Sequence, residues 1–176
     1  MKREDVDKLI RSWSLDETLK HRCLRYAYVG SYRRGAEDVG DLDVLLCCDD
    51  RCWVELDDIF QSGGKLLDGD YRYKAYEIVL ANPERLVKVE LQRVTESIWG
   101  NALVYFTGPR AENERLRKVA WDRGWLWLKR GNLFDFAVTE YPMFQTEEEV
   151  YGFLGLSYVP PERRGIPAIP DQGGQA

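Results

Sequence analysis

The sequence predicts an α+β fold in which a mixed sheet of four or five strands is flanked by helices. Apolar and polar residues alternate along residues 85–94, which is the pattern of a strand with one buried face. Apolar residues recur every three or four positions along residues 5–13 and 51–60, as in amphipathic helices. With 44% hydrophobic residues among 176, the chain can bury the core of one ordinary domain or two small ones.

The first part of the chain carries the predicted sheet. Its strand segments are rich in Leu, Val, Ile and Tyr, and the helix between them stops at Gly63-Gly64. The expected elements are helix 5–13, helix 16–25, strand 23–29, strand 41–48, helix 51–60, strand 71–80 and strand 85–94. Residues 30–40, which are punctuated by glycines, are expected to form a loop.

A boundary is expected at residues 108–110, after which the chain forms a second, smaller unit. Thr146 and Glu149 make a capping box, the usual start of a short helix. The expected elements are helix 111–123, a hairpin over 125–136 that turns at 130–132, a short helix from Thr146 and a disordered tail over 166–176.

Composition excludes several classes of protein. No apolar run reaches the roughly 18–20 residues that span a bilayer, and the N-terminus has no signal-peptide core, so we expect an intracellular protein. The single histidine, His21, disfavours a His-based triad or a His-rich metal site. Cys47, Cys48 and Cys52 lack the Cys-x2-Cys spacing of a zinc site, and we expect them to be buried thiols.

Two carboxylates, Asp41 and Asp43, are two positions apart on a predicted strand, so both project from one face of the sheet. Glu90 lies on the polar face of strand 85–94 and joins them if the two strands are neighbours. Three carboxylates without His or Cys suit hard cations such as Mg²⁺ or Mn²⁺. Two alternatives stay open: a solvated Asp-x-Asp at a strand end, and a surface Glu90 paired with Lys88.

The loop before Asp41 has the residues of a phosphate-binding turn. Gly30-Ser31 follows a predicted strand, which lets backbone N–H groups and the serine hydroxyl approach phosphate oxygens closely. Arg33 and Arg34 can supply guanidinium groups to the same phosphates. Gly40, which has no side chain, leaves space beside the carboxylates.

Four motifs follow one another along the chain: GSYRRGAEDVGDLDVLL at residues 30–46, Glu90 sixteen residues before Phe106, YFTGP at 105–109, and LGLSYVPPERR at 154–164. With these motifs the sequence resembles the family X DNA polymerases, which are polymerase-beta-like nucleotidyltransferases. The resemblance implies a catalytic palm over residues 1–108 and a small α/β, nucleotide-selecting thumb over 109–165. The family's lyase domain and DNA-binding fingers are not expected here.

For the carboxylates, the resemblance implies that Asp41 and Asp43 bind two Mg²⁺ ions, with Mn²⁺ able to substitute. Glu90 would bind the catalytic ion and help to deprotonate the primer 3′-hydroxyl. The sequence departs from the family's pattern at three positions. Glu90 stands where the family usually has Asp, and Lys88 and Gln92 stand where the polymerase-beta pattern has arginines.

The resemblance also implies a set of nucleotide-binding residues. The triphosphate, the sugar and the minor-groove edge of the incoming base would be held by Gly30, Ser31, Arg34, Gly40, Tyr105, Phe106, Gly108 and Asn113. Without the resemblance, Tyr105 and Phe106 would read as strand core. The resemblance further implies a cis peptide bond between Gly108 and Pro109.

Residues 110–130 carry seven Lys and Arg against three Asp and Glu, although the net charge of the chain is −5. This local excess predicts contacts with DNA phosphates, and the alternative is an ordinary solvated helix face. The expected DNA-binding residues are Arg115, Arg117, Lys118 and Arg123.

The expected function is a template-directed DNA polymerase that adds deoxynucleotides to a primer 3′-hydroxyl by two-metal phosphoryl transfer, filling short gaps in DNA repair. Its expected partners are primer–template or gapped DNA and a dNTP, and the protein is expected to be a monomer. One alternative is a nucleotidyltransferase that acts on a small molecule, a tRNA end or a protein. A second alternative is a non-catalytic module that binds DNA ends.

Overall fold

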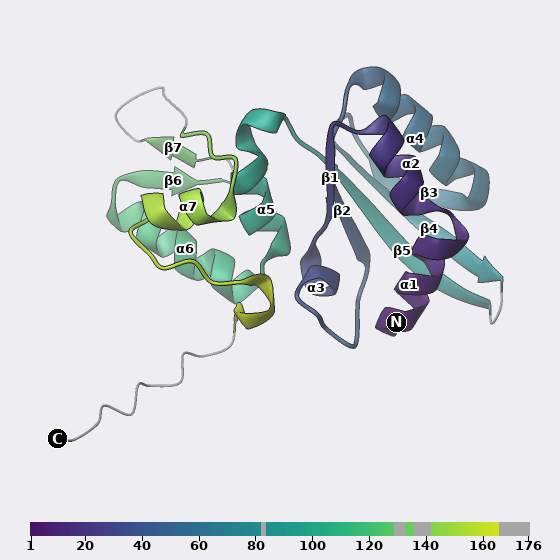
Figure 1. The fold of residues 1–176 in the computed structure, drawn as a ribbon, viewed down its shortest axis with the longest axis horizontal. Coiled ribbons are helices and arrows are strands. Elements are labelled where there is room, and N and C mark those ends of the chain that lie inside the picture. Colours follow the sequence, from purple (N-terminus) through teal and green to yellow (C-terminus); the bar gives the residue numbers. More distant parts are fainter. Residues whose placement is uncertain (82–83, 129–132, 136–141, 166–176) are drawn as a thin grey trace.

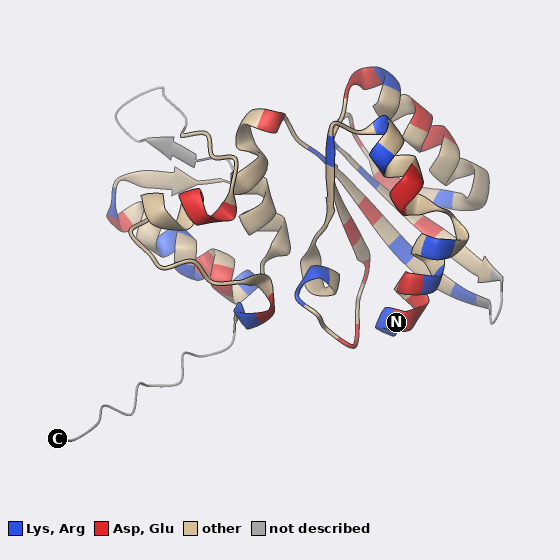
Figure 2. Cartoon of the chain, in the orientation of Figure 1, with Lys and Arg blue, Asp and Glu red and all other residues tan. Residues whose placement is uncertain are grey.

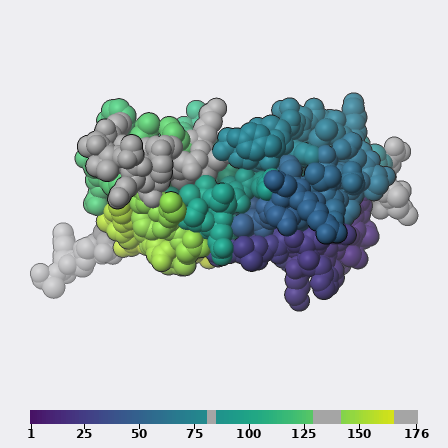
Figure 3. All heavy atoms as spheres, turned by 90° about the horizontal axis from the view of Figure 1, so that it is seen from above, coloured from purple at the N-terminus to yellow at the C-terminus, as the bar shows by residue number. Residues whose placement is uncertain are grey.

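The computed structural model of the chain describes residues 1–81, 84–128, 133–135 and 142–165. Two lobes lie side by side (Figure 1), and the space-filling view shows them in contact (Figure 3). The predicted turn at 130–132 and the predicted tail at 166–176 lie outside the described residues.

The first lobe is built on a five-stranded mixed sheet, which agrees with the predicted fold class. The strand order is β1-β2-β5-β4-β3; β2 and β5 run parallel, and the other neighbours are antiparallel. The elements of this lobe are α1 (Arg3–Ser12), α2 (Leu15–Arg22), β1 (Arg25–Tyr28), α3 (Gly30–Arg33), β2 (Leu42–Cys47), α4 (Asp50–Gly63), β3 (Gly64–Gly69), β4 (Tyr73–Ala81) and β5 (Glu84–Arg93).

Helices α1, α2 and α4 cover one face of this sheet (Figure 1). Leu9 of α1 and Phe60 of α4 pack with Val44 of β2 and Val89 of β5, and all four side chains are buried. The apolar face predicted for strand 85–94 is therefore the face that joins the main core. Because side chains alternate along a strand, the residues between these positions point to the other face.

The second lobe is smaller and has its own core. Its elements are η1 (Glu96–Ile98), α5 (Trp99–Thr107), α6 (Arg110–Asp122), β6 (Trp125–Trp127), β7 (Leu133–Asp135), α7 (Glu147–Phe153) and η3 (Pro161–Arg163). Leu116 and Ala120 of α6 are buried with Val150 and Tyr151 of α7. The antiparallel β6–β7 pair agrees with the predicted hairpin.

Helix α5 connects the two lobes. Trp99 and Ala102 pack against Leu45 and Cys47 on the face of β2 that α1, α2 and α4 leave free. Val104 joins the core of the second lobe. Near the start of β2 this second sheet face carries polar residues, and the functional site is built there.

Three details that the sequence analysis predicted can be compared with the structure. The Thr146–Glu149 capping box is present, with Glu149 N–H donating to Thr146 Oγ1 at 3.2 Å. The Gly108–Pro109 peptide bond is cis, and α6 begins directly after it. Cys47 and Cys52 are buried as predicted, whereas Cys48, which was also expected to be buried, is half-buried.

Three other details differ from the sequence predictions. Strand β3 was not predicted, because nearly all its side chains are exposed at the sheet edge and so show no alternation. The predicted loop after residue 29 contains the single helical turn α3. The alternative interpretation of Tyr105 and Phe106 as strand core is wrong, because both lie on α5.

Among the described residues, no helix is both long and apolar enough to cross a membrane.

Candidate active site

Three carboxylates meet on the sheet face where α5 ends. Asp43 and Glu90 are register partners across the parallel β2–β5 pair, and Asp41 immediately precedes β2. One oxygen atom from each of the three lies within 4.8 Å of the other two. The structure therefore brings together the three carboxylates that the strand pattern grouped, and we call them the carboxylate triad.

The triad is electrostatically strained when no cation is bound. Burial, together with the neighbouring charges of Asp41 and Glu90, raises the pKa of Asp43 to about 7. Burial raises the pKa of Asp41 as well, again with a contribution from Glu90. Carboxylates this close disfavour each other's charged form, so a cation is needed to keep all three ionised at neutral pH.

Lys88 supplies part of that positive charge. Its ammonium group donates a hydrogen bond to Glu90 and lies 3.9 Å from Asp41 Oδ2. The bond to Glu90 raises the pKa of Lys88. Glu90 therefore both pairs with Lys88 and belongs to the triad. One ammonium group matches only one of the three negative charges.

The donor set fits hard divalent cations. The triad offers only carboxylate oxygens, which Mg²⁺ and Mn²⁺ prefer, and no sulfur or imidazole. The raised pKa of Asp43 also favours a cation site, because a nearby cation would restore the ionised form of this carboxylate. The residues that could hold such cations are Asp41, Asp43 and Glu90.

A cavity of about 600 Å³ opens beside Asp41 and Asp43 and extends to α5 and α6. It is lined by all eight residues that the resemblance assigned to nucleotide binding: Gly30, Ser31, Arg34, Gly40, Tyr105, Phe106, Gly108 and Asn113. Further lining residues, which the sequence analysis did not assign to the nucleotide, are Thr107, Pro109, Arg110, Glu114 and Arg117. Two segments far apart in the sequence therefore form the walls of one cavity.

Gly30 lies directly against the triad at the start of α3. Its φ is +61°, and a Cβ at this position would collide with Asp43 Oδ2. Glycine is the residue that tolerates both the positive φ and the close approach. The first turn of α3 thus approaches the Asp43 carboxylate closely.

We expect Gly30→Ala to weaken divalent-cation binding by at least about tenfold, because the new methyl group displaces the Asp43 carboxylate. The binding is measured by calorimetric titration with Mg²⁺ and Mn²⁺. Gly35→Ala is the matched control, since Gly35 also has a positive φ, +79°, but no atom lies within 4 Å of its added Cβ. Equal cation affinities of the two variants would contradict this account of the site.

The two arginines after Ser31 have different surroundings. Arg34 lines the cavity and donates a hydrogen bond to the Thr107 carbonyl. Burial lowers the pKa of Arg34, and among the described residues it forms no salt bridge. Arg33 instead donates to Thr107 Oγ1 at 2.6 Å, and of the two arginines that the sequence grouped only Arg34 lines the cavity.

Arg33 belongs to a buried network that the sequence analysis missed. Its guanidinium donates two hydrogen bonds to Glu147 of α7, at 2.7 and 2.9 Å. Glu147 also accepts from Arg164 at 2.9 Å and from the Tyr158 hydroxyl at 3.1 Å. The network joins α3 of the first lobe to the second lobe. The one signal in the sequence was the motif at 154–164, whose last residue is Arg164.

Helix α6 fixes the aromatic end of α5. Asn113 Nδ2 donates to the Tyr105 carbonyl at 2.7 Å. The Arg117 guanidinium lies 5.7 Å from the centre of the Tyr105 ring, and the rings of Tyr105 and Phe106 meet edge to face at 5.1 Å. Asn113 Oδ1 is buried without a hydrogen-bond partner among the described residues, so it is available to a ligand.

The four basic residues predicted to bind DNA do not share one kind of environment. Arg115 is paired with Glu112 through hydrogen bonds of 2.9 and 2.7 Å. Arg117 faces the cavity, and the Arg123 guanidinium lies against Gly155. Figure 2 shows both signs of charge along α6. Arg115 and Arg123 therefore make contacts within the second lobe, whereas Arg117 is turned toward the cavity.

Comparison with protein families gives each lobe a match. The family model of the DNA polymerase beta palm matches residues 3–67, and that of the DNA polymerase beta thumb matches residues 102–165. The two matches define a protein with a palm and a thumb. The chain belongs to the family X DNA polymerases. Asp41 and Asp43 lie inside the palm match, whereas Glu90 lies between the two matches and is placed by the sheet register.

Two curated relatives are similar to the chain. It is 29% identical over 143 residues to the DNA polymerase/3′-5′ exonuclease PolX of Bacillus subtilis. The aligned region covers 80% of this chain and 24% of that protein. It is 32% identical over 80 residues to the human DNA-directed DNA/RNA polymerase mu. This second aligned region covers 46% of this chain and 16% of that protein. The matched region therefore spans a quarter or less of each relative.

Proposed function

We propose that the chain is a template-directed DNA polymerase that adds deoxynucleotides to a primer 3′-hydroxyl, with short-gap filling in DNA repair as its role. The observation that carries this proposal is the carboxylate triad at the edge of a cavity lined by Arg34 and the Tyr105–Phe106 end of α5. Both relatives are named as DNA polymerases. The proposed division is a palm over residues 1–108 and a thumb over 109–165.

Asp41, Asp43 and Glu90 would hold two divalent cations, Mg²⁺ or Mn²⁺. Bound there, such cations would neutralise the negative charge that develops on the transferring phosphoryl group. Glu90 is placed beside Asp43 by the parallel register, and Lys88 orients its carboxylate through a hydrogen bond. We assign Glu90 to accept the proton of the attacking 3′-hydroxyl.

The triphosphate is assigned to the loop that begins at Gly30. Arg34 is half-buried and has no carboxylate in salt-bridge distance among the described residues, so a phosphate group would supply its missing counter-charge. Ser31 and Gly40 line the same cavity and contribute a hydroxyl group and close backbone approach.

The sugar and base of the incoming nucleotide are assigned to the other wall. Tyr105 and Phe106 offer apolar ring surface to the deoxyribose, next to Gly108. Asn113 lies where its amide can reach a base edge from α6. Beyond the cavity, Arg115, Arg117, Lys118 and Arg123 are proposed to contact DNA phosphates, and the active form is proposed to be a monomer.

The proposal is tested by primer extension with one dNTP at a time, on gapped and ungapped templates, with Mg²⁺ and with Mn²⁺. We expect incorporation only of the nucleotide complementary to the template, and faster incorporation on the gapped substrate. Addition that ignores the template would favour a nucleotidyltransferase that acts on another acceptor. Binding to DNA ends without any turnover would favour a non-catalytic module.

A further inference from the structure

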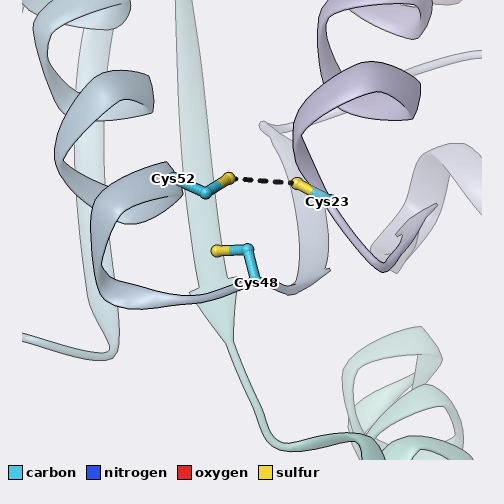
Figure 4. A group of neighbouring side chains, drawn as sticks. All are labelled: Cys23, Cys48 and Cys52. Carbon is cyan, nitrogen blue, oxygen red and sulfur yellow. Dashed lines mark hydrogen bonds between the residues drawn. The ribbon is translucent and has the colours of Figure 1, made fainter.

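Three of the four cysteines meet at the end of the palm sheet (Figure 4). Cys23 follows α2, Cys48 follows β2, and Cys52 lies in the first turn of α4. All three sulfur atoms lie within 4.8 Å of one another, and the Sγ atoms of Cys23 and Cys52 are 3.8 Å apart. The spacing of Cys48 and Cys52 did not indicate this cluster, because the third member comes from a separate element.

The sulfur separations fit a metal–thiolate site. Zn²⁺ binds thiolates at about 2.3 Å in tetrahedral geometry, which places two bound sulfurs about 3.8 Å apart. The Cys23–Cys52 separation has this value, and Cys48 is close enough to become the third ligand after a small rotation of its side chain. Figure 4 shows the side chains of Cys23 and Cys52 pointing toward each other, with Cys48 beside them.

The backbone around the cysteines is held by interactions of its own. Cys52 N–H donates to the side chain of Asp49, the N-cap residue of α4, at 2.7 Å. Arg93 of β5 donates from Nε to the Cys48 carbonyl at 3.1 Å, which also brings a positive charge close to the cluster. These contacts orient two of the three thiols without using the sulfur atoms, which remain available as ligands.

The cluster is distinct from the carboxylate triad in place and in chemistry. Asp43 and Cys48 lie near opposite ends of β2, and five residues of strand span roughly 16 Å. Sulfur ligands select soft and borderline ions such as Zn²⁺, whereas the triad offers only oxygen. Cys23 and Cys48 are half-buried, so an ion can reach them from solvent.

We propose that Cys23, Cys48 and Cys52 form a zinc site with three thiolate ligands, which fastens α2, β2 and α4 to one another. Binding converts the three thiols to thiolates and releases their protons to solvent. His21 and Cys52 line a second, separate pocket, but the His21 ring is largely exposed and lies 3.6 Å from Glu17. We therefore assign the fourth position on the ion to a water molecule.

The test uses the full chain, reduced and stripped of metal, with Mg²⁺ in excess to occupy the carboxylate triad. Titration with Co²⁺ should give the thiolate-to-metal charge-transfer bands of a tetrahedral site at one equivalent, and Zn²⁺ should then displace the Co²⁺. Replacement of Cys23, Cys48 or Cys52 by Ser should lower the affinity for Zn²⁺ at least tenfold. It should also weaken the charge-transfer band by about one third, the share of one thiolate in three.

Cys47→Ala is the matched control, because Cys47 is a buried thiol on β2 whose sulfur lies outside the cluster. It should leave the Co²⁺ spectrum and the Zn²⁺ affinity unchanged. Three results would overturn the proposal: no thiolate bands at saturating Co²⁺, an equal loss of affinity in Cys47→Ala, or undiminished Zn²⁺ binding by the triple Ser variant. A chain that binds zinc but does not extend primers would keep this site and refute the polymerase proposal.

Discussion

Asp43→Asn should reduce nucleotide incorporation by about a thousandfold or more, which corresponds to about 4 kcal/mol of lost transition-state stabilisation. The substitution removes one charge from the centre of the triad, where Asp41 and Glu90 are its immediate neighbours. Among the described residues, no other carboxylate joins this cluster to replace it. Single-turnover extension of a primer at saturating dNTP measures the loss.

A stability measurement separates this loss from misfolding. Burial and two like charges raise the pKa of Asp43 to about 7, so its ionised form opposes folding at and above neutral pH when no metal is bound. In the presence of a chelator, Asp43→Asn should therefore unfold at a higher temperature than the wild type. Added Mg²⁺ should stabilise the wild type and leave the variant unchanged.

Asp38→Asn provides the control, since Asp38 lies in the loop that leads into β2 but is exposed and pairs with Lys2. This variant should keep both its activity and its response to Mg²⁺. If Asp43→Asn retained a tenth of the wild-type rate, the triad would not be the catalytic centre.

Glu147→Gln should lower the free energy of unfolding by about 3–5 kcal/mol at pH 7, because the buried Arg164 and the half-buried Arg33 both lose their counter-charge. Urea denaturation measures this change. Glu148→Gln is the matched control, since it removes the same charge from the same helical turn at an exposed position. Equal stabilities of the two variants would show that the network between the lobes contributes little.

The difference between wild type and Glu147→Gln should depend on pH. Burial acts to raise the pKa of Glu147, but the hydrogen bonds from Arg33 and Arg164 outweigh it and hold the pKa below its ordinary value of 4.5. A carboxylate with a lowered pKa stabilises the fold above its unfolded-state pKa and loses that contribution as the pH falls. The difference should be constant above about pH 5.5 and shrink below pH 4.5.

Elements with one buried face could be predicted from the sequence, and elements without that asymmetry could not. Strand β5 alternates because Val87 and Leu91 face the core, and Lys88 and Glu90 do not. Strand β3 is exposed along its length, and α5 is buried toward both lobes. Neither segment therefore shows a regular alternation of apolar and polar residues. Their placement depends on neighbours that the local pattern does not contain.

The same reasoning separates the site residues. The carboxylate triad and the loop at Gly30 carry local signals, because close repulsion and a positive φ each restrict the residue type. Arg33 and Glu147 meet across 114 positions of sequence, and each looks locally like a solvated charge. The cysteine cluster was missed for a similar reason, since Cys23 approaches the other two only after the strands pair.

Helix α5 makes the palm and the thumb inseparable in a practical sense. The thumb match begins at residue 102, inside this helix, and the proposed palm ends at its last turn. Expressed without the second lobe, α5 would present Val104 to water; expressed without the first lobe, α5 would expose Trp99 and Ala102. Each large apolar side chain uncovered in this way forfeits about 1.5–3 kcal/mol. A recombined enzyme that takes its two halves from different relatives would therefore need a matched pair of surfaces on both sides of one shared helix.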